Sequence, residues 1–207
     1  MPVRDQPPRI VITGAAHGIG RLCALSLSDW NLELILSDHD GAGLSGLCSS
    51  LGCLGRFCDV ASEASVAVFA EDLLDNFYAI DGLIIVAGGG HIRSLGMWRV
   101  ARALMPALRR SDGALIVNIG PSADPRRHDY EFPYASSEEA FHEITSALVT
   151  ATRGSGVEVA SVAGAGPGAS RQARHPSVCA SEVLGLVARR FGLPPFGRAD
   201  QSGRRRA

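Results

Sequence analysis

The chain has 207 residues, of which 46% are hydrophobic, and a formal net charge of −1. This length suits one domain with a sizeable core, and the charge gives no electrostatic case for a nucleic-acid or membrane partner. Five cysteines without a Cys-x-x-Cys pair argue against a disulfide framework and against a zinc site. Residues 1–9 do not resemble a signal peptide and no apolar run could span a bilayer, so we expect a cytoplasmic protein.

The first predicted element is a buried strand that leads through a glycine-rich turn into a helix. Residues 10–12 are an apolar run typical of a strand buried on both faces, and residues 13–20 read Thr-Gly-x-x-x-Gly-x-Gly. A strand, a glycine turn and a helix together direct free backbone N–H groups at a phosphate. Gly14 allows a sharp turn, while Gly18 and Gly20 leave room for a pyrophosphate and for close packing of the helix on the strand.

The rest of the chain alternates between strand and helix patterns. Strands are predicted at residues 10–12, 32–37, 54–57, 81–86, 114–119 and 157–162, and helices at 21–29, 41–51, 61–77, 93–110, 132–152 and 177–191. This alternation predicts one doubly wound, Rossmann-like α/β domain over residues 9–193, with six parallel strands in the order 3-2-1-4-5-6. Residues 1–8 are expected to form a flexible terminus and residues 194–207 a disordered tail.

Acidic residues follow the second and third predicted strands. Asp38 ends the second strand, where a carboxylate suits the hydroxyl groups of an adenosine ribose and repels the 2′-phosphate of NADP. Sheets of this kind bind ligands at the carboxyl ends of the strands, where the strand order reverses. We therefore expect Gly14–Gly20, Asp38, Asp59 and Ala87–Gly88 around one crevice, although a surface aspartate without a ligand is the alternative at position 38.

Residues 9–168 resemble the short-chain dehydrogenase/reductase family, because their motifs follow one another in the same order as in that family. The resemblance implies a nicotinamide dinucleotide held by Gly14, His17, Gly18, Ile19, Gly20, Asp38, Asp59, Val60, Ala87 and Gly88. Asp59-Val60 resembles the pair beside the adenine ring, and Ala87-Gly88 retains half of the family's Asn-Asn-Ala-Gly. Asp38 favours NAD over NADP, whereas His17 occupies a position where NADP-preferring relatives often carry arginine or lysine.

The catalytic half of the motif set departs from the family pattern. In the family, a tyrosine transfers the proton of the substrate oxygen, and a lysine four residues later lowers the tyrosine's pKa. Here Tyr134-Ala-Ser-Ser-Glu138 places a carboxylate at the lysine position, and all 20 basic residues of the chain are arginines. The family also has a serine that orients the substrate. When the family motif is aligned with this sequence without a gap, that serine corresponds to Pro121, and a shift of one residue makes it correspond to Ser122. Tyr134 and Ser122 are the predicted catalytic residues, and no metal is predicted.

Two main functions are compatible with these residues, besides a non-redox reaction on the same fold, such as dehydration or epimerisation, or a truncated or decayed gene product without cofactor binding. One is a weakly active oxidoreductase that transfers a hydride between a nicotinamide cofactor and a small alcohol or carbonyl compound. The other is an NAD(H)-binding pseudo-enzyme that acts as a sensor, scaffold or subunit partner. The resemblance also implies an interface between two copies, or with a relative, through helices 93–110 and 132–152. The stripe of Trp98, Leu104, Met105 and Leu108 would then face a partner, unless it packs in the core.

Overall fold

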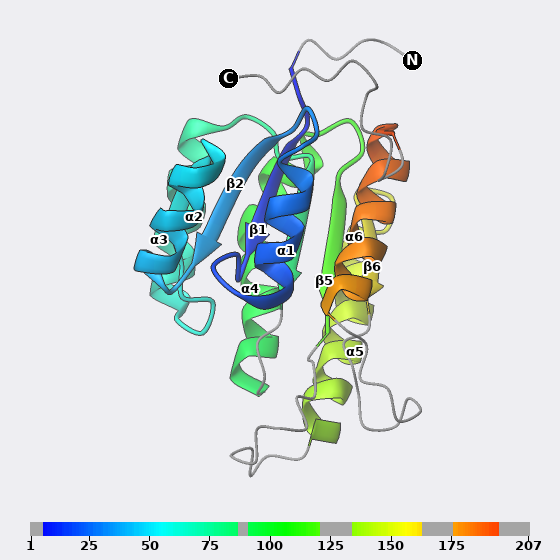
Figure 1. Ribbon diagram of the computed structural model, residues 1–207. Helices are drawn as coiled ribbons and strands as arrows, with labels where there is room; N and C mark the ends of the chain where they lie inside the picture. Colours follow the sequence, from blue (N-terminus) through cyan, green and yellow to red (C-terminus); the bar gives the residue numbers. More distant parts are fainter. Residues whose placement is uncertain (1–5, 87–90, 121–133, 163–175, 195–207) are drawn as a thin grey trace.

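The computed structural model describes residues 6–86, 91–120, 134–162 and 176–194 (Figure 1). The strands are β1 (Arg9–Thr13), β2 (Glu33–Asp38), β3 (Leu54–Phe57), β4 (Gly82–Val86), β5 (Leu115–Ile119) and β6 (Glu158–Val162). The helices are α1 (Gly18–Leu27), α2 (Gly41–Leu51), α3 (Glu63–Asn76), α4 (His91–Arg109), α5 (Tyr134–Thr152) and α6 (Pro176–Phe191). Strands and helices alternate along the chain, as the sequence predicts.

The six strands form one sheet in the order β3-β2-β1-β4-β5-β6, and every neighbouring pair is parallel. Val11 on the central strand is paired in register with Ile35 of β2 and Leu83 of β4. The predicted strand order 3-2-1-4-5-6 is confirmed. The order reverses between β1 and β4, so the carboxyl ends of these two strands flank the expected ligand crevice.

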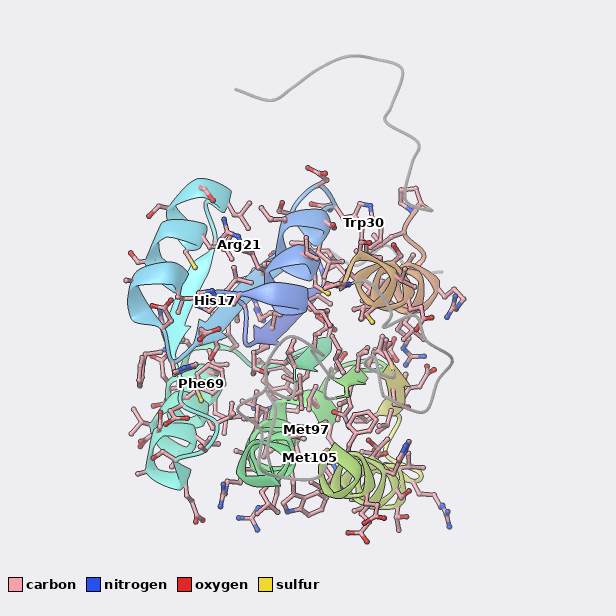
Figure 2. The ribbon with its side chains drawn as sticks, turned by 60° about the horizontal axis from the view of Figure 1, so that its bottom comes forward. His17, Arg21, Trp30, Phe69, Met97 and Met105 are labelled. Atoms are coloured by element: carbon pink, nitrogen blue, oxygen red, sulfur yellow. The ribbon has the colours of Figure 1, made fainter. Side chains whose placement is uncertain are left out.

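Helices cover both faces of the sheet, which explains the apolar runs of its central strands β1, β2, β4 and β5. Ile10 and Ile12 belong to a core shared with α1, α2 and α6, whereas Val11 between them belongs to the core under α3, α4 and α5. Figure 2 looks toward the carboxyl ends of the strands and shows Met97 and Met105 of α4 on one side and His17 on the other. A three-layer α/β/α domain results.

Most predicted boundaries lie within a few residues of those in the structure, and α2 and β3 are identical to their predictions. Ser62 caps α3 as expected, since its side chain accepts a hydrogen bond from the Ser65 backbone N–H. The first helix starts earlier than predicted: α1 begins at Gly18, because the last two glycines of the loop already form its first turn. None of the helices in the described residues combines the length and apolar character that crossing a membrane requires.

Candidate functional site

The glycine-rich loop between β1 and α1 has the backbone that its sequence requires. Gly14 and Gly18 adopt positive φ values of 66° and 51°, which residues with a side chain rarely do. A Cβ atom on Gly14 would lie 3.2 Å from Cβ of Val86, so the loop packs closely on the end of β4. A Cβ atom on Gly18 would meet nothing within 4 Å, so the space above this position is open among the described residues.

The N-terminus of α1 opens toward the same space. His17 is its N-cap, yet the His17 side chain makes no hydrogen bond to the first turn of the helix. The first N–H groups of a helix lack intrahelical partners and carry partial positive charge, so an uncapped end suits an anion such as a pyrophosphate. Ile19 contributes only its backbone there, because its side chain is buried in the core with Cys23 and Leu27.

Asp38 lies at the end of β2, and its carboxylate is buried, with 3% of the residue exposed. Its Oδ2 accepts a hydrogen bond of 2.9 Å from the backbone N–H of Ala16 in the glycine loop. Its Oδ1 accepts one from the backbone N–H of Asp40, also at 2.9 Å, and lies 3.0 Å from Nδ1 of His39. The carboxylate therefore joins the glycine loop to the segment that enters α2.

A second acid–imidazole pair lies beside the first. Nε2 of His17 lies 2.8 Å from Oδ2 of Asp40, which is the N-cap of α2 and accepts a hydrogen bond from the Gly43 backbone N–H. The pKa of the Asp40 carboxyl is held below its usual value, mainly by the Gly43 N–H and then by the His17 hydrogen bond. His17 thus reaches from the glycine loop to α2 (Figure 2).

Asp59 and Val60 follow β3 and lie next to the Asp38 segment. The backbone N–H of Cys58 donates to the carbonyl oxygen of Asp38 at 3.1 Å, which brings the ends of β2 and β3 together. Oδ1 of Asp59 accepts a hydrogen bond from the Ala61 N–H and so shapes the turn before α3. Val60 packs under α4, where a Cβ on Gly96 would lie 2.7 Å from the Val60 carbonyl oxygen. The structure thus brings Gly14–Gly20, Asp38 and Asp59 to one edge of the sheet.

The predicted catalytic residues are described only in part. Tyr134 and Glu138 both belong to α5, four residues apart, so the two positions share a face of this helix. Ser122, Pro121, Ala87 and Gly88 lie outside the described residues. Within the described part of the chain, no group of three or more His, Cys, Asp or Glu residues is arranged to hold a metal ion.

Strand β5 holds a buried polar side chain that the sequence analysis did not single out. Asn118 is fully buried, and its Nδ2 donates to Oγ1 of Thr145 on α5 at 3.2 Å. Its Oδ1 atom has no hydrogen-bond partner among the described residues. This contact ties β5 to α5, the helix on which Tyr134 lies, and no sequence pattern indicates it.

Asp40 and His39 are likewise absent from the residues that the sequence singles out. Asp40 carries a signal that could have found it, because an aspartate directly before a predicted helix is a common N-cap. The pairing of His39 with Asp38 has no such signal, since it depends on how the chain turns after β2.

Comparison with known proteins agrees with this geometry. Residues 8–173 match the family model described as short chain dehydrogenase. The chain belongs to the short-chain dehydrogenase family. Among curated relatives, it is 28% identical over 169 residues to an L-fucose dehydrogenase of Oryctolagus cuniculus. It is 22% identical over 151 residues to a 7alpha-hydroxysteroid dehydrogenase of Escherichia coli. The matches cover 72% and 63% of this chain but only 59% of each relative.

Solved structures of the family share the fold. The Pseudomonas aeruginosa RhlG/NADP active-site complex superposes with a TM-score of 0.74 at 20% identity, covering 88% of this chain and 89% of the other. A metagenomic short-chain oxidoreductase in complex with NADP gives a TM-score of 0.72 at 21% identity, covering 95% and 93%. In our chain, the open space over Gly18, the uncapped α1 and the carboxylate of Asp38 fit a nicotinamide dinucleotide.

Proposed function

We propose that this short-chain dehydrogenase relative binds NAD(H) in preference to NADP(H) at the edge formed by Gly18, Asp38 and Asp59. The observation that carries the proposal is the carboxylate of Asp38, held at the end of β2 by the N–H groups of Ala16 and Asp40. Its Oδ2 accepts one hydrogen bond from the described residues, and a carboxylate oxygen can accept two. It keeps acceptor capacity for a ribose hydroxyl and would repel a 2′-phosphate.

The cofactor preference rests on this chain's own residues. The two structural neighbours described above are NADP complexes, so family likeness alone does not favour NAD. The described residues around Asp38 include no arginine hydrogen-bonded to it, although an arginine there would hold a 2′-phosphate.

For the reaction, we propose a weak oxidation of a small alcohol, or reduction of the matching carbonyl compound. The bound dinucleotide would supply or accept the hydride. Tyr134 would donate a proton to the carbonyl oxygen, and Ser122 would orient the substrate. Glu138 stands one helical turn after Tyr134, and a carboxylate there raises the pKa of a phenol instead of lowering it. Activity near neutral pH would therefore be low.

The second candidate is a pseudo-enzyme that binds NAD(H) and acts as a sensor, scaffold or subunit partner. It is favoured by the complete absence of lysine from the chain, because no alignment shift restores the family's tyrosine–lysine pair. The two candidates share one dinucleotide site and differ only in whether the bound dinucleotide exchanges a hydride with a substrate.

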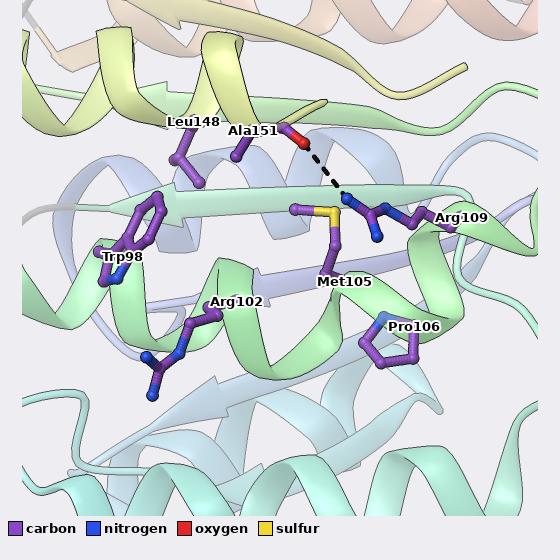
Figure 3. A pocket seen from close by; sticks show the side chains of 7 residues that line it. All are labelled: Trp98, Arg102, Met105, Pro106, Arg109, Leu148 and Ala151. Atoms are coloured by element: carbon purple, nitrogen blue, oxygen red, sulfur yellow. Dashed lines mark hydrogen bonds between the residues drawn. The ribbon is translucent and has the colours of Figure 1, made fainter. Parts of the chain in front are cut away.

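An interface on α4 and α5 would serve either function. A groove of about 440 Å³ lies between the two helices, away from the N-terminus of α1, and is lined by Trp98, Arg102, Met105, Pro106, Arg109, Leu148 and Ala151 (Figure 3). Helix α4 contains four arginines and no acid, whereas α5 contains three glutamates and no arginine or lysine. Two copies packed with α4 against α5 would pair these opposite charges.

The deciding experiment is a fluorescence titration with NADH and NADPH, followed by a panel of small carbonyl substrates. Tighter binding of NADH together with slow turnover supports the weak oxidoreductase. Tighter binding of NADH without turnover supports the pseudo-enzyme. If neither dinucleotide binds, both candidates are wrong, and tighter binding of NADPH would contradict the role given to Asp38.

A further inference from the structure

We propose that the pairs His17–Asp40 and His39–Asp38 form a proton-operated selectivity site, which favours NAD(H) when the imidazoles are neutral and admits NADP(H) when they are protonated. This inference rests on the proposed dinucleotide site and adds its regulation by pH. It concerns four side chains that the fold brings together from the glycine loop, the end of β2 and the start of α2.

The hydrogen bonds fix how these side chains are arranged. A carboxylate accepts hydrogen bonds and donates none, so Nε2 of His17 carries a hydrogen toward Asp40 at 2.8 Å. Nδ1 of His39 lies 3.0 Å from Oδ1 of Asp38, where a protonated ring forms an ion pair with the carboxylate. Proton uptake at the other nitrogen of His17 leaves its hydrogen bond in place, and a positive charge on His39 strengthens its attraction to Asp38. Protonation therefore changes the charge of the site without breaking these contacts.

The charge of the cluster depends on this arrangement. Two carboxylates with two neutral imidazoles carry −2, and protonation of both rings adds +2, which brings the cluster to zero. Asp40 stays ionised under mildly acidic conditions, because the Gly43 N–H and His17 hold its pKa below the usual value. Histidine is the side chain whose charge ordinarily changes between pH 5 and pH 8.

The imidazoles are open to a ligand. The side chains of His17 and His39 are 67% and 55% exposed, whereas that of Asp38 is 3% exposed. A phosphate bound near Asp38 would meet the rings before it met the buried acid. On the adjoining elements, α1 carries Arg21, β3 carries Arg56, which pairs with Asp72 of α3, Asp59 follows β3, and α2 carries no charged residue. Arg21 and Asp59 have opposite charges.

The test compares NADH and NADPH binding, measured by fluorescence from pH 5.5 to pH 8.5, with circular dichroism to confirm the fold at each pH. We expect the affinity for NADPH relative to NADH to rise on the order of tenfold toward acid pH. A 2′-phosphate titrates near pH 6 by itself, so the decisive comparison is with the double variant His17→Gln, His39→Gln. Its smaller rise would report the ligand's own titration.

His142→Gln is the matched control, because His142 is exposed on α5, which covers the face of the sheet opposite α1 and α2. It should keep the wild-type profile. If wild type and the double variant show the same rise, or if the wild-type ratio is flat, the inference is wrong even though NADH binds. If NADH binds at no pH, the proposed function and this inference fail together.

Discussion

A side chain on residue 20 would overlap the carbonyl oxygen of Gly14. The overlap is with backbone, and the same Cβ would also lie 3.2 Å from Cα of Ala15. No rotation of a flexible side chain can relieve such a contact. The third residue of α1 must therefore be glycine for the loop after β1 to fold back over the helix.

Gly20→Ala should destabilise the protein and weaken dinucleotide binding. Inserting a methyl group into a closely packed site costs about 1–3 kcal/mol, because the backbone has to shift. The shift would move the N–H groups at the start of α1, which we propose hold the pyrophosphate. Urea denaturation measures the first effect and NADH titration the second. An unchanged unfolding midpoint would show that the loop relaxes freely.

Gly46→Ala is the matched control for this variant. Gly46 is an exposed interior residue of α2, and a Cβ there would meet nothing within 4 Å. Alanine is favoured over glycine inside a helix by about 0.5–1 kcal/mol, so this change should stabilise the protein. The same substitution is thus expected to have opposite signs at the two positions.

Asp38→Ala should relax the discrimination against NADPH and also destabilise the fold. The substitution removes the acceptor of the Ala16 N–H, and Ala16 is buried with 2% exposure. A buried donor left without a partner costs about 1–3 kcal/mol. The ratio of the two dinucleotide affinities and the urea midpoint measure the two effects separately.

Asp59→Ala controls for a general loss of binding. Asp59 lies at the proposed adenine end of the site, and its Oδ1 shapes the turn before α3 through the Ala61 N–H. Replacing it should weaken NADH and NADPH alike. A change in the affinity ratio at Asp59, with none at Asp38, would show that the ribose lies elsewhere.

The fold could be predicted because the central strands β1, β2, β4 and β5 are buried on both faces. Such strands are continuous apolar runs, and parallel strands need helical connections, so alternation fixes the sheet type. Boundaries are harder to predict where glycine serves two purposes. Gly18 has a positive φ of 51° typical of a turn and yet begins α1, so the sequence pattern predicts a helix that starts three residues late.

Only the site residues that belong to a recognisable sequence motif could be predicted. Gly14, Asp38 and Asp59 follow strands in a recognisable order, and the structure brings them to one edge. The contacts of Asp38 with Ala16 and His39 depend on the path of the chain after β2, which no local pattern specifies. The hydrogen bond between Asn118 and Thr145 joins residues 27 positions apart, so no local sequence pattern specifies it either.

Val149→Arg should dissociate a dimer formed through α4 and α5. Val149 is 45% exposed on α5, and an arginine there would place a positive charge opposite the four arginines of α4. Sedimentation velocity should show the wild type as a dimer and the variant as a monomer. The control Val68→Arg makes the same change on α3, where the residue is 67% exposed, and should leave the dimer intact. A wild type that sediments as a monomer at every concentration contradicts the interface.

Glu138 decides between an enzyme and a pseudo-enzyme. It lies one helical turn after Tyr134 in α5, and two anions a few ångströms apart each raise the other's proton affinity. Each unit of pKa corresponds to about 1.4 kcal/mol, or a factor of ten in the population of the reactive form. We therefore expect a glutamate in place of a cation to cost orders of magnitude in rate near neutral pH, unless another group supplies the charge.

Glu138→Lys should raise kcat/KM for carbonyl reduction at least tenfold and shift the pH profile of the activity toward neutral pH, since a cation lowers the pKa of a nearby phenol. Glu138→Gln removes the anion without adding a cation and should give a smaller gain. Glu139→Lys, at an exposed position five residues after Tyr134, should give none. Turnover that survives Tyr134→Phe would show that another group donates the proton. If the lysine brings no gain while NADH still binds, the defect lies with Pro121 at the serine position and not with Glu138.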